Sequence, residues 1–343
     1  MQIQENISLK NYNSFGLDVN AKYFSVFTDI PSLAELLETG RHPFTTERSR
    51  RLLILGGGSN MLLTNDFNGL VIKNNIPGIR KTAEDEQHVY VTVGAGENWH
   101  ETVMHCIDMG WGGLENLALI PGNTGASPMQ NIGAYGVEIK DHFYQLEAWD
   151  IEDKKTVIFT AAECEFGYRE SVFKGRLKNR FVITSVSFRL DKNPAFHITY
   201  GAIREELERQ GVQDLSIRAI ADAVISIRRS KLPDPAVIGN AGSFFKNPEI
   251  PASQFEELKS VYPEIVGYPL PGAMVKLAAG WLIEKAGWKG YREGDAGCHA
   301  KQALVLVNYG NASGHEILKL SDKISESVRE KFGVHLQKEV NVV

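Results

Sequence analysis

Two glycine-rich segments constrain this chain more than any other feature. The first, LGGGSN, runs from residue 55 to 60 and directly follows the apolar run LLI. The second, IPGNTGASPMQNIGAYG, runs from residue 120 to 136 and contains no charged residue. A long loop inside a domain is usually functional or disordered, and this one has too little charge for disorder. Glycines let a backbone approach a ligand closely, and their amides can form a nest for phosphate oxygens.

Neither segment matches a familiar nucleotide motif. The first is not G-x-x-x-x-G-K-[ST], and it is not a clean G-x-G-x-x-G that opens a long helix. Read alone, it fits a plain tight turn as well as a ligand site. Two such segments in one half of the chain favour a large ligand contacted at several points, and the dinucleotide FAD has that character.

Composition excludes several classes of protein. A length of 343 residues predicts two domains or three, and a net charge of -5 argues against nucleic acid or an anionic membrane as the main partner. The cysteines at 106, 164 and 298 are widely separated, so neither a disulfide framework nor a zinc ribbon is expected. The histidines of HETVMH are five residues apart, off the i, i+4 spacing of a zinc helix, and we expect no metal. With neither a signal peptide nor an apolar membrane span, the protein is expected to be cytoplasmic.

The hydrophobic pattern mixes helices and strands without a regular βαβ rhythm, so we predict an α+β fold. Strands are expected at 52–55, 69–73, 88–96, 181–190 and 303–308. Helices are expected at 31–40, 98–110, 218–233, 278–287 and 313–333. Asn98 with Glu101 has the pattern of a capping box, and Gly40, Gly110 and Gly333 are natural helix ends. Pro233 ends the helix at 218–233, and we place the main domain boundary at residues 228–235.

Short polar motifs follow these elements. NAGSFFKNP places the single hydroxyl of Ser243 between Gly242 and two phenylalanines, as in a turn before a buried strand or in a dry reactive pocket. RRSKLPDP reads as a solvated helix end or as a diphosphate site. FGYRE, ITYG and HLQKEVNVV contribute Tyr168, Arg169, Tyr200 and, in an expected C-terminal strand, Glu339. Taken singly, each of these residues is more often structural than catalytic.

Taken together, the motifs resemble the UDP-N-acetylenolpyruvoylglucosamine reductase family (MurB), over nearly the whole chain. The resemblance rests on NYNSFGLDVNA, LGGGSN, VGAGENW, ENLALIPGNTGASPMQNIGAYG, FGYRES, SIRRSKLPDP, GNAGSFFKNP and HAKQALVLVN. The first half alone would indicate only the wider vanillyl-alcohol-oxidase group of FAD proteins. Tyr200 suggests the longer subtype, in which a tyrosine loop covers the substrate.

The resemblance implies an activity and assigns roles to residues. It implies hydride transfer from NADPH to bound FAD and then to UDP-N-acetylglucosamine enolpyruvate, giving UDP-N-acetylmuramate. Ser243 matches the general acid, Arg169 the arginine on the substrate carboxylate, and Glu339 a glutamate that stabilises the enolate. The positions that match substrate-binding residues are Tyr168, Tyr200, Arg228, Lys231 and Asn247. The FAD-binding positions are expected to be Gly56, Gly57, Gly58, Ser59, Asn60, Met61, Pro121, Gly122, Gly125, Ala126, Gln130, Asn131, Ile132, Gly133, Ala134, Tyr135 and Gly136.

The resemblance also implies a division of the chain. Residues 1–75 and 76–228 would form two FAD-binding subdomains, 229–330 a substrate-binding domain, and 331–343 a strand returning to the active site of a monomer. Asn341 departs from the family, because an arginine is expected there, and a cation near the flavin would be missing. Two other hypotheses stay open at this point: a flavin oxidase or dehydrogenase with another substrate, and a non-catalytic nucleotide-binding protein. The segment 228–248 argues against the first, and Ser243, Arg169 and Glu339 together argue against the second.

Overall fold

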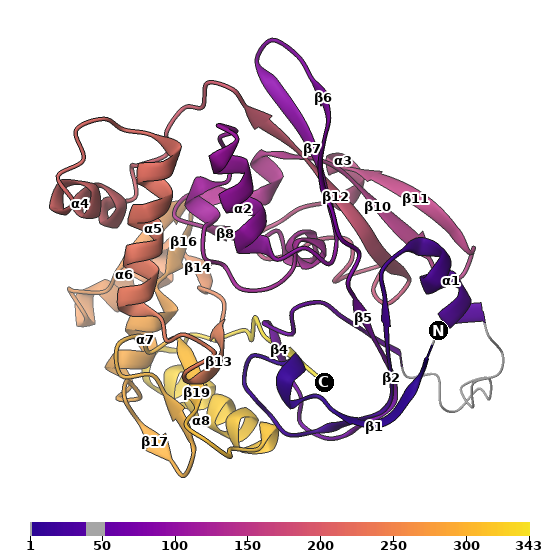
Figure 1. Ribbon diagram of the computed structural model, residues 1–343. Helices are drawn as coiled ribbons and strands as arrows, with labels where there is room; N and C mark the ends of the chain where they lie inside the picture. Colours follow the sequence, from indigo (N-terminus) through magenta and orange to yellow (C-terminus); the bar gives the residue numbers. More distant parts are fainter. Residues whose placement is uncertain (1, 39–51) are drawn as a thin grey trace. The chain divides into compact units, whose positions relative to one another are not determined.

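The computed structural model of the protein describes residues 2–38 and 52–343 (Figure 1). The chain divides into two compact units. The first unit comprises the described residues within 1–7, 21–57 and 67–230, and the second those within 8–20, 58–66 and 231–343. The division passes through the first glycine-rich segment, between Gly57 and Gly58.

The first unit contains a four-stranded sheet near its N-terminal end. Its strands lie in the order β1-β2-β5-β3, and the three strands β2, β5 and β3 run parallel. Helix α1 (Ile30–Glu38) packs Leu33 and Leu36 into the same cluster as Leu70 and Ile72 of β5. The bounds are Gln4–Ser8 for β1, Asn20–Phe27 for β2, Leu52–Leu55 for β3 and Phe67–Asn74 for β5.

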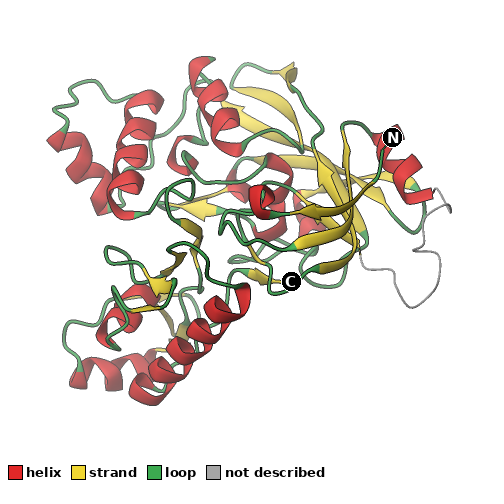
Figure 2. Ribbon diagram, turned by 60° about the horizontal axis from the view of Figure 1, so that its bottom comes forward, coloured by secondary structure: helices red, strands yellow, loops and turns green. Residues whose placement is uncertain are grey.

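The first unit also contains a five-stranded antiparallel sheet (Figures 1 and 2). Its order is β11 (Lys155–Thr160), β10 (Phe143–Asp150), β12 (Phe181–Asp191), β7 (His88–Gly94) and β6 (Ile79–Glu84). Its buried side chains form one core with those of the helices. These helices are α2 (Trp99–Asp108), α3 (Ala161–Cys164), α4 (Gly201–Arg209) and α5 (Ile217–Lys231).

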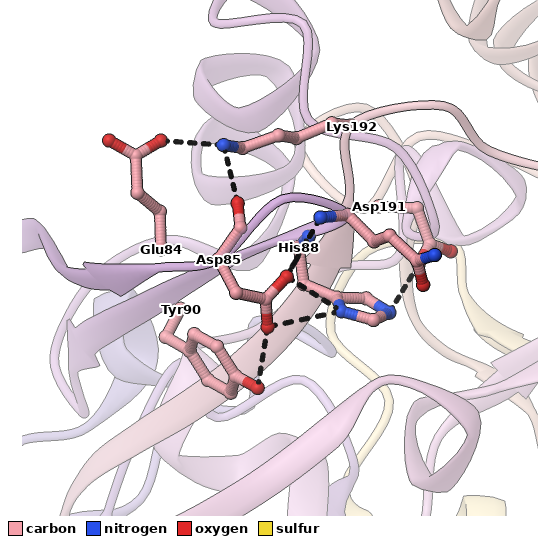
Figure 3. Close-up of polar contacts among 7 residues, drawn as sticks. Glu84, Asp85, His88, Tyr90, Asp191 and Lys192 are labelled. Atoms are coloured by element: carbon pink, nitrogen blue, oxygen red, sulfur yellow. Dashed lines mark hydrogen bonds and ion pairs between the residues drawn. The ribbon is translucent and has the colours of Figure 1, made fainter.

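Charged side chains fix the β6–β7 hairpin to the end of β12 (Figure 3). The His88 ring lies between two carboxylates, with Nδ1 3.1 Å from Asp85 Oδ1 and Nε2 3.5 Å from Asp191 Oδ1. Lys192 donates to the Asp85 carbonyl at 2.7 Å and pairs with Glu84 at 2.8 Å. These contacts anchor the point from which residues 192–200 lead to α4.

The second unit contains two small antiparallel sheets and three helices. The order β13-β19-β18-β17 comprises Gly239–Ser243, Val305–Asn308, Ala296–Cys298 and Arg292–Glu293. The order β14-β16-β15 comprises Glu249–Pro251, Met274–Leu277 and Gly267–Leu270. The helices are α6 (Ala252–Val261), α7 (Ala279–Lys285) and α8 (Gly314–Phe332), and β4 (Met61–Leu62) pairs in parallel with β20 (Asn341–Val342).

The α+β class is confirmed, and several predicted boundaries hold. The Asn98 side chain accepts from the Glu101 amide at the start of α2, as a capping residue should. Helix α8 begins after Ser313, which forms a capping box with Glu316, and ends at Gly333 with φ +66°. Gly40, the expected end of the helix at 31–40, lies outside the described residues. No helix within residues 2–38 and 52–343 combines the length and apolar character that crossing a bilayer requires.

Two sequence predictions were wrong in detail. The second glycine-rich segment is not a continuous loop, because it contains the 3-10 helix η3 (Thr124–Gln130) and the strand β8 (Gly133–Ala134), which pairs with β9 (Val137–Glu138). The C-terminal strand at 331–343 is also shorter than predicted. Residues 331 and 332 end α8, and Glu339 precedes β20, with only a single bridge at Lys338 before it.

Candidate active site

In the first unit the two glycine-rich segments lie against each other. A Cβ on Gly57 would lie 2.7 Å from Asn123 Oδ1 and 2.8 Å from Gly122 Cα, which no real side chain tolerates. Asn123 Nδ2 in turn donates to the Gly96 carbonyl at 2.5 Å. Glycine is therefore required at 57 because two backbones meet there, a reason that the sequence alone did not provide.

This meeting point offers backbone donors to a ligand. Within residues 2–38 and 52–343, no protein group accepts a hydrogen bond from the amide of Gly57 or Gly122. Lys73 Nζ lies 3.3 Å from the Gly56 carbonyl oxygen, and burial lowers the pKa of its ammonium. Backbone amides and a nearby lysine are groups that bind the diphosphate of a dinucleotide, so the residues present fit FAD.

The second glycine-rich segment is held in shape by its own polar groups. Asn131 is fully buried with φ +44°, and its Nδ2 donates to Glu138 Oε2 and to the Gly167 carbonyl, each at 3.0 Å. Its Oδ1 accepts from the Lys140 amide at 3.1 Å. Since both ends of this amide bind protein groups, the Asn131 side chain shapes the segment.

The FGYRES segment, residues 166–171, packs against the same loop. Arg169 Nη2 donates to the Gly133 carbonyl at 2.6 Å, and Ser171 Oγ donates to the Met129 carbonyl at 2.7 Å. Arg169 has φ +55°, and its guanidinium carbon lies 5.3 Å from the centre of the Tyr168 ring. Glu138 Oε1 lies 4.0 Å from Arg169 Nη1. The structure therefore places the predicted carboxylate-binding arginine at the predicted cofactor loop.

Two tyrosines and an arginine form a second group in this unit. The rings of Tyr135 and Tyr200 meet edge to face, with centroids 5.4 Å apart. Tyr200 is the residue before α4 and is 48% exposed, whereas burial raises the pKa of the Tyr135 phenol. Arg228 Nε donates to the Leu119 carbonyl at 3.2 Å, and burial lowers the pKa of its guanidinium. Its charge and the Tyr135 hydroxyl interact electrostatically.

In the second unit the predicted general acid is held by main-chain bonds. Ser243 ends β13 and pairs with Val305 of β19, and the left-handed Gly242 before it has φ +68°. The Phe244 amide donates to the Leu304 carbonyl, and the Phe244 carbonyl accepts from the Glu339 amide, both at 2.8 Å. Phe244 and Phe245 are 0% and 1% exposed, so they anchor the segment in the core.

The segment of Glu339 therefore lies directly beside that of Ser243. Asn60 Nδ2 donates to the Glu339 carbonyl at 3.3 Å, which joins the first glycine-rich segment to the same group. Asn341, where an arginine was expected, donates from its amide at 3.1 Å and from its Nδ2 at 2.9 Å to the Asn60 carbonyl. The side chain at 341 thus supports the segment of Asn60.

Asn247 and Lys231 are the remaining predicted residues of the second unit. Asn247 Oδ1 accepts from the Ala279 amide at 3.0 Å, at the start of α7. Lys231 is exposed at the end of α5. Of the predicted catalytic and substrate-binding residues, the first unit holds Tyr168, Arg169, Tyr200 and Arg228, and the second holds Lys231, Ser243, Asn247 and Glu339.

Sequence reasoning did not single out three residues at these sites. Lys73, Glu138 and Asn116 contact the glycine-rich segments through bonds to distant main-chain or side-chain groups. Only the position of Asn116, inside the quoted motif ENLALIPG, offered a signal. Neither Lys73 nor Glu138 lies in a pattern that distinguishes it from an ordinary core or surface residue.

Comparison with known proteins identifies the family of this chain. A family model described as the C-terminal domain of UDP-N-acetylenolpyruvoylglucosamine reductase matches residues 234–343, and one described as an FAD binding domain matches residues 43–159. Proteins named UDP-N-acetylenolpyruvoylglucosamine reductase are similar over the full chain. The one from Flavobacterium johnsoniae is 49% identical and covers 100% of both chains, and the one from Pseudomonas putida is 50% identical over 100% of this chain and 99% of its own.

A solved structure supports the fold. The crystal structure of UDP-N-acetylenolpyruvylglucosamine reductase from Thermus caldophilus covers 100% of this chain and 99% of its own, with a TM-score of 0.68 and 24% identity. The family itself follows from the full-length relatives at about half identity. The chain belongs to the UDP-N-acetylenolpyruvoylglucosamine reductase family.

Proposed function

We propose that this protein reduces UDP-N-acetylglucosamine enolpyruvate to UDP-N-acetylmuramate in peptidoglycan precursor synthesis, with NADPH as electron donor and FAD as bound cofactor. The observation that carries the proposal is the pairing of the Ser243 and Glu339 segments in the second unit of a chain of this family. We further propose that it acts as a cytoplasmic monomer. Its two FAD-binding subdomains would be residues 1–75 and 76–228, followed by a substrate domain at 229–330 and a terminal segment at 331–343.

The glycine-rich segments would hold the cofactor. The Gly57 and Gly122 amides and the Lys73 ammonium suit its diphosphate, and the backbone around Gly133 to Gly136 suits the hydrogen-bonding edges of its ring. When bound, FAD would supply the chemistry of hydride transfer from NADPH to the enolpyruvyl double bond. Gly58 admits no side chain, because a Cβ there would meet the Tyr12 carbonyl.

The substrate carboxylate would be met by Arg169. As hydride reaches the terminal carbon, negative charge develops on the neighbouring carbon and on its carboxylate. A fixed guanidinium stabilises such charge strongly where water is excluded. The bond from Arg169 to the Gly133 carbonyl supplies the fixed orientation that this role requires. Glu339, in its protonated form, would add a hydrogen bond to the enolate.

Ser243 would complete the reaction by donating its hydroxyl proton to the enolate carbon. An alcohol is a weak acid, but an enolate carbon is basic enough for the transfer to run downhill. Hydride and proton together saturate the double bond. The left-handed conformation of Gly242 turns the backbone just before Ser243. The buried side chains of Phe244 and Phe245 anchor the backbone just after Ser243. Tyr168, Tyr200, Arg228, Lys231 and Asn247 would bind the sugar and diphosphate of the substrate.

The test follows the flavin absorbance of the purified, FAD-loaded protein without oxygen. We expect NADPH to bleach the flavin and UDP-N-acetylglucosamine enolpyruvate to restore its colour. Bleaching without recovery would reject the substrate and leave a flavoprotein with another electron acceptor. A protein that binds no FAD at all would overturn the assignment of both glycine-rich segments.

A further inference from the structure

Asn116 occupies an unusual place in the first unit. It lies in the 3-10 helix η2 (Glu115–Leu117), ahead of the second glycine-rich segment, and is 1% exposed. Its Nδ2 donates to the Tyr135 carbonyl at 3.1 Å and to the His197 carbonyl at 2.8 Å. One buried amide group thus joins two segments that are far apart in the sequence.

The orientation of this amide is determined by its partners. Carbonyl oxygens only accept hydrogen bonds, so the nitrogen of Asn116 must face both of them. Its Oδ1 is then buried, and it has no hydrogen-bond partner among the described residues. An unpartnered buried oxygen lowers the free energy of unfolding. The asparagine at 116 is therefore explained by the two hydrogen bonds that its nitrogen donates, and not by any stability that its oxygen provides.

Both accepting segments carry the tyrosines of the candidate site. Tyr135 belongs to the second glycine-rich segment, and His197 lies three residues before Tyr200, in a stretch with neither helix nor strand from 193 to 199. The two tyrosine rings touch edge to face. The bond to His197 therefore anchors the irregular stretch just before its tyrosine.

The residues after Asn116 are anchored as well. The Leu119 amide donates to His100 Nδ1 of α2 at 3.1 Å, and the Leu119 carbonyl accepts from Arg228 of α5 at 3.2 Å. Leu119 has φ +59°, so these bonds hold a conformation that leucine rarely adopts. Asn116 therefore lies in a segment that is fixed to α2 and α5. From this position its side chain can hold the segments of Tyr135 and Tyr200 side by side.

We propose that Asn116 is a positioning residue that holds Tyr200 against Tyr135, so that the tyrosine-bearing stretch is preorganised for the UDP-sugar substrate. This inference rests on the proposed function and adds to it a residue that would act through the tyrosine segments. Preorganisation lowers the cost of ordering the stretch when substrate binds. Loss of Asn116 should therefore weaken substrate binding more than FAD binding and leave the chemical step nearly unchanged.

Two variants separate positioning from folding. Asn116→Asp keeps the shape but turns an acceptor toward two carbonyls, and Asn116→Leu removes the bonds together with the unpartnered oxygen. We expect both to raise KM for UDP-N-acetylglucosamine enolpyruvate about tenfold and to change kcat by less than about threefold. The Kd for FAD should rise by no more than about threefold, because Gly133 and Ala134 of the Tyr135 segment stay paired with β9. The matched control is Asn74→Asp, which removes a buried donor to the Ile183 carbonyl in the same unit. Asn74→Asp should lower stability without raising KM.

A double-variant cycle and hydrogen exchange make the test specific. If Asn116 acts through Tyr200, then Asn116→Leu should raise KM no further in a Tyr200→Ala background. Amides of residues 195–200 should exchange faster in Asn116→Leu than in the parent protein without any substrate. An unchanged KM, additive effects in the cycle, unchanged exchange, or an equal loss of FAD affinity would each overturn the proposal. If the parent protein fails to turn over the substrate, the proposed function fails, whereas the exchange result still decides whether Asn116 orders the stretch.

Discussion

Ser243 and Arg169, the two residues proposed to act on the reacting carbon and its carboxylate, are positioned in different ways. Main-chain bonds hold the Ser243 segment, because Phe244 bonds to Leu304 on one side and to Glu339 on the other. Arg169 is held by its own side chain, which donates to the Gly133 carbonyl. A main-chain frame survives a change of side chain, whereas a side-chain bond does not. Substitution of Ser243 should therefore remove only its chemical role. Substitution of Arg169 should remove its chemical role and also the side-chain bond that orders the loop around Gly133.

Ser243→Ala should have the largest effect. Loss of a general acid slows proton transfer by about a thousandfold, so the restoration of flavin colour by UDP-N-acetylglucosamine enolpyruvate should slow by about that factor. Bleaching by NADPH and the Kd for FAD should stay unchanged, because the frame around 243 is main chain. Ser321→Ala is the matched control, since it removes a buried hydroxyl of the same unit that donates to the Leu318 carbonyl at 2.7 Å. Near-normal turnover in Ser243→Ala would remove Ser243 from the acid role.

Arg169→Gln should lower the rate of substrate reduction by about a hundredfold, because the developing carboxylate charge loses its cation. It should also weaken FAD binding by about tenfold, since the Gly133 carbonyl loses a charged donor. Rapid-mixing kinetics and FAD titration of the apoprotein measure the two effects. Arg176→Gln, which removes an exposed partner of Glu165, is the control. Unchanged FAD affinity in Arg169→Gln would show that the arginine does not order the loop, and the contrast with Ser243 would disappear.

Gly242→Ala tests the frame at 243 directly. A Cβ on Gly242 would meet no atom within 4 Å, but φ is +68°, so the substitution is opposed by backbone strain alone. We expect it to lower the free energy of unfolding by about 1–2 kcal/mol in urea titration. Gly201→Ala also has open space for its Cβ, and it has no positive φ, so it should not destabilise the protein. If both variants behave alike, the left-handed turn before Ser243 does not depend on glycine.

The sequence predicted best what local interactions determine. The capping residues Asn98 and Ser313 and the terminal Gly333 act within a few residues, so their helices could be read from short patterns. The 3-10 helix at Thr124–Gln130 was missed, because it contains Pro128 and has no hydrophobic period. The family resemblance provided the candidate catalytic residues, which no single motif could.

What the sequence could not provide was the set of long-range partners. Gly57 is required because of Gly122, and Arg169 is oriented by the Gly133 carbonyl. Asn116 Nδ2 donates to the His197 carbonyl, 81 residues away, and no residue near Asn116 in the sequence indicates that bond. Every residue has a backbone carbonyl, so the sequence does not show which carbonyl a given side chain will bind.

Asn341→Ala should have the smallest effect and is the sharpest test of the main-chain frame. The variant loses one bond from Nδ2 to the Asn60 carbonyl, but the amide of residue 341 still donates to the same oxygen. We expect a loss of at most about 1 kcal/mol in the free energy of unfolding and an unchanged rate of substrate reduction. Asn311→Ala, at an exposed position of the same unit, is the matched control. A large loss of rate in Asn341→Ala would mean that side chains also order the segments around Ser243 and Glu339. The position of Ser243 would then depend on side-chain bonds, as the position of Arg169 does. The two residues would differ only in their chemical roles.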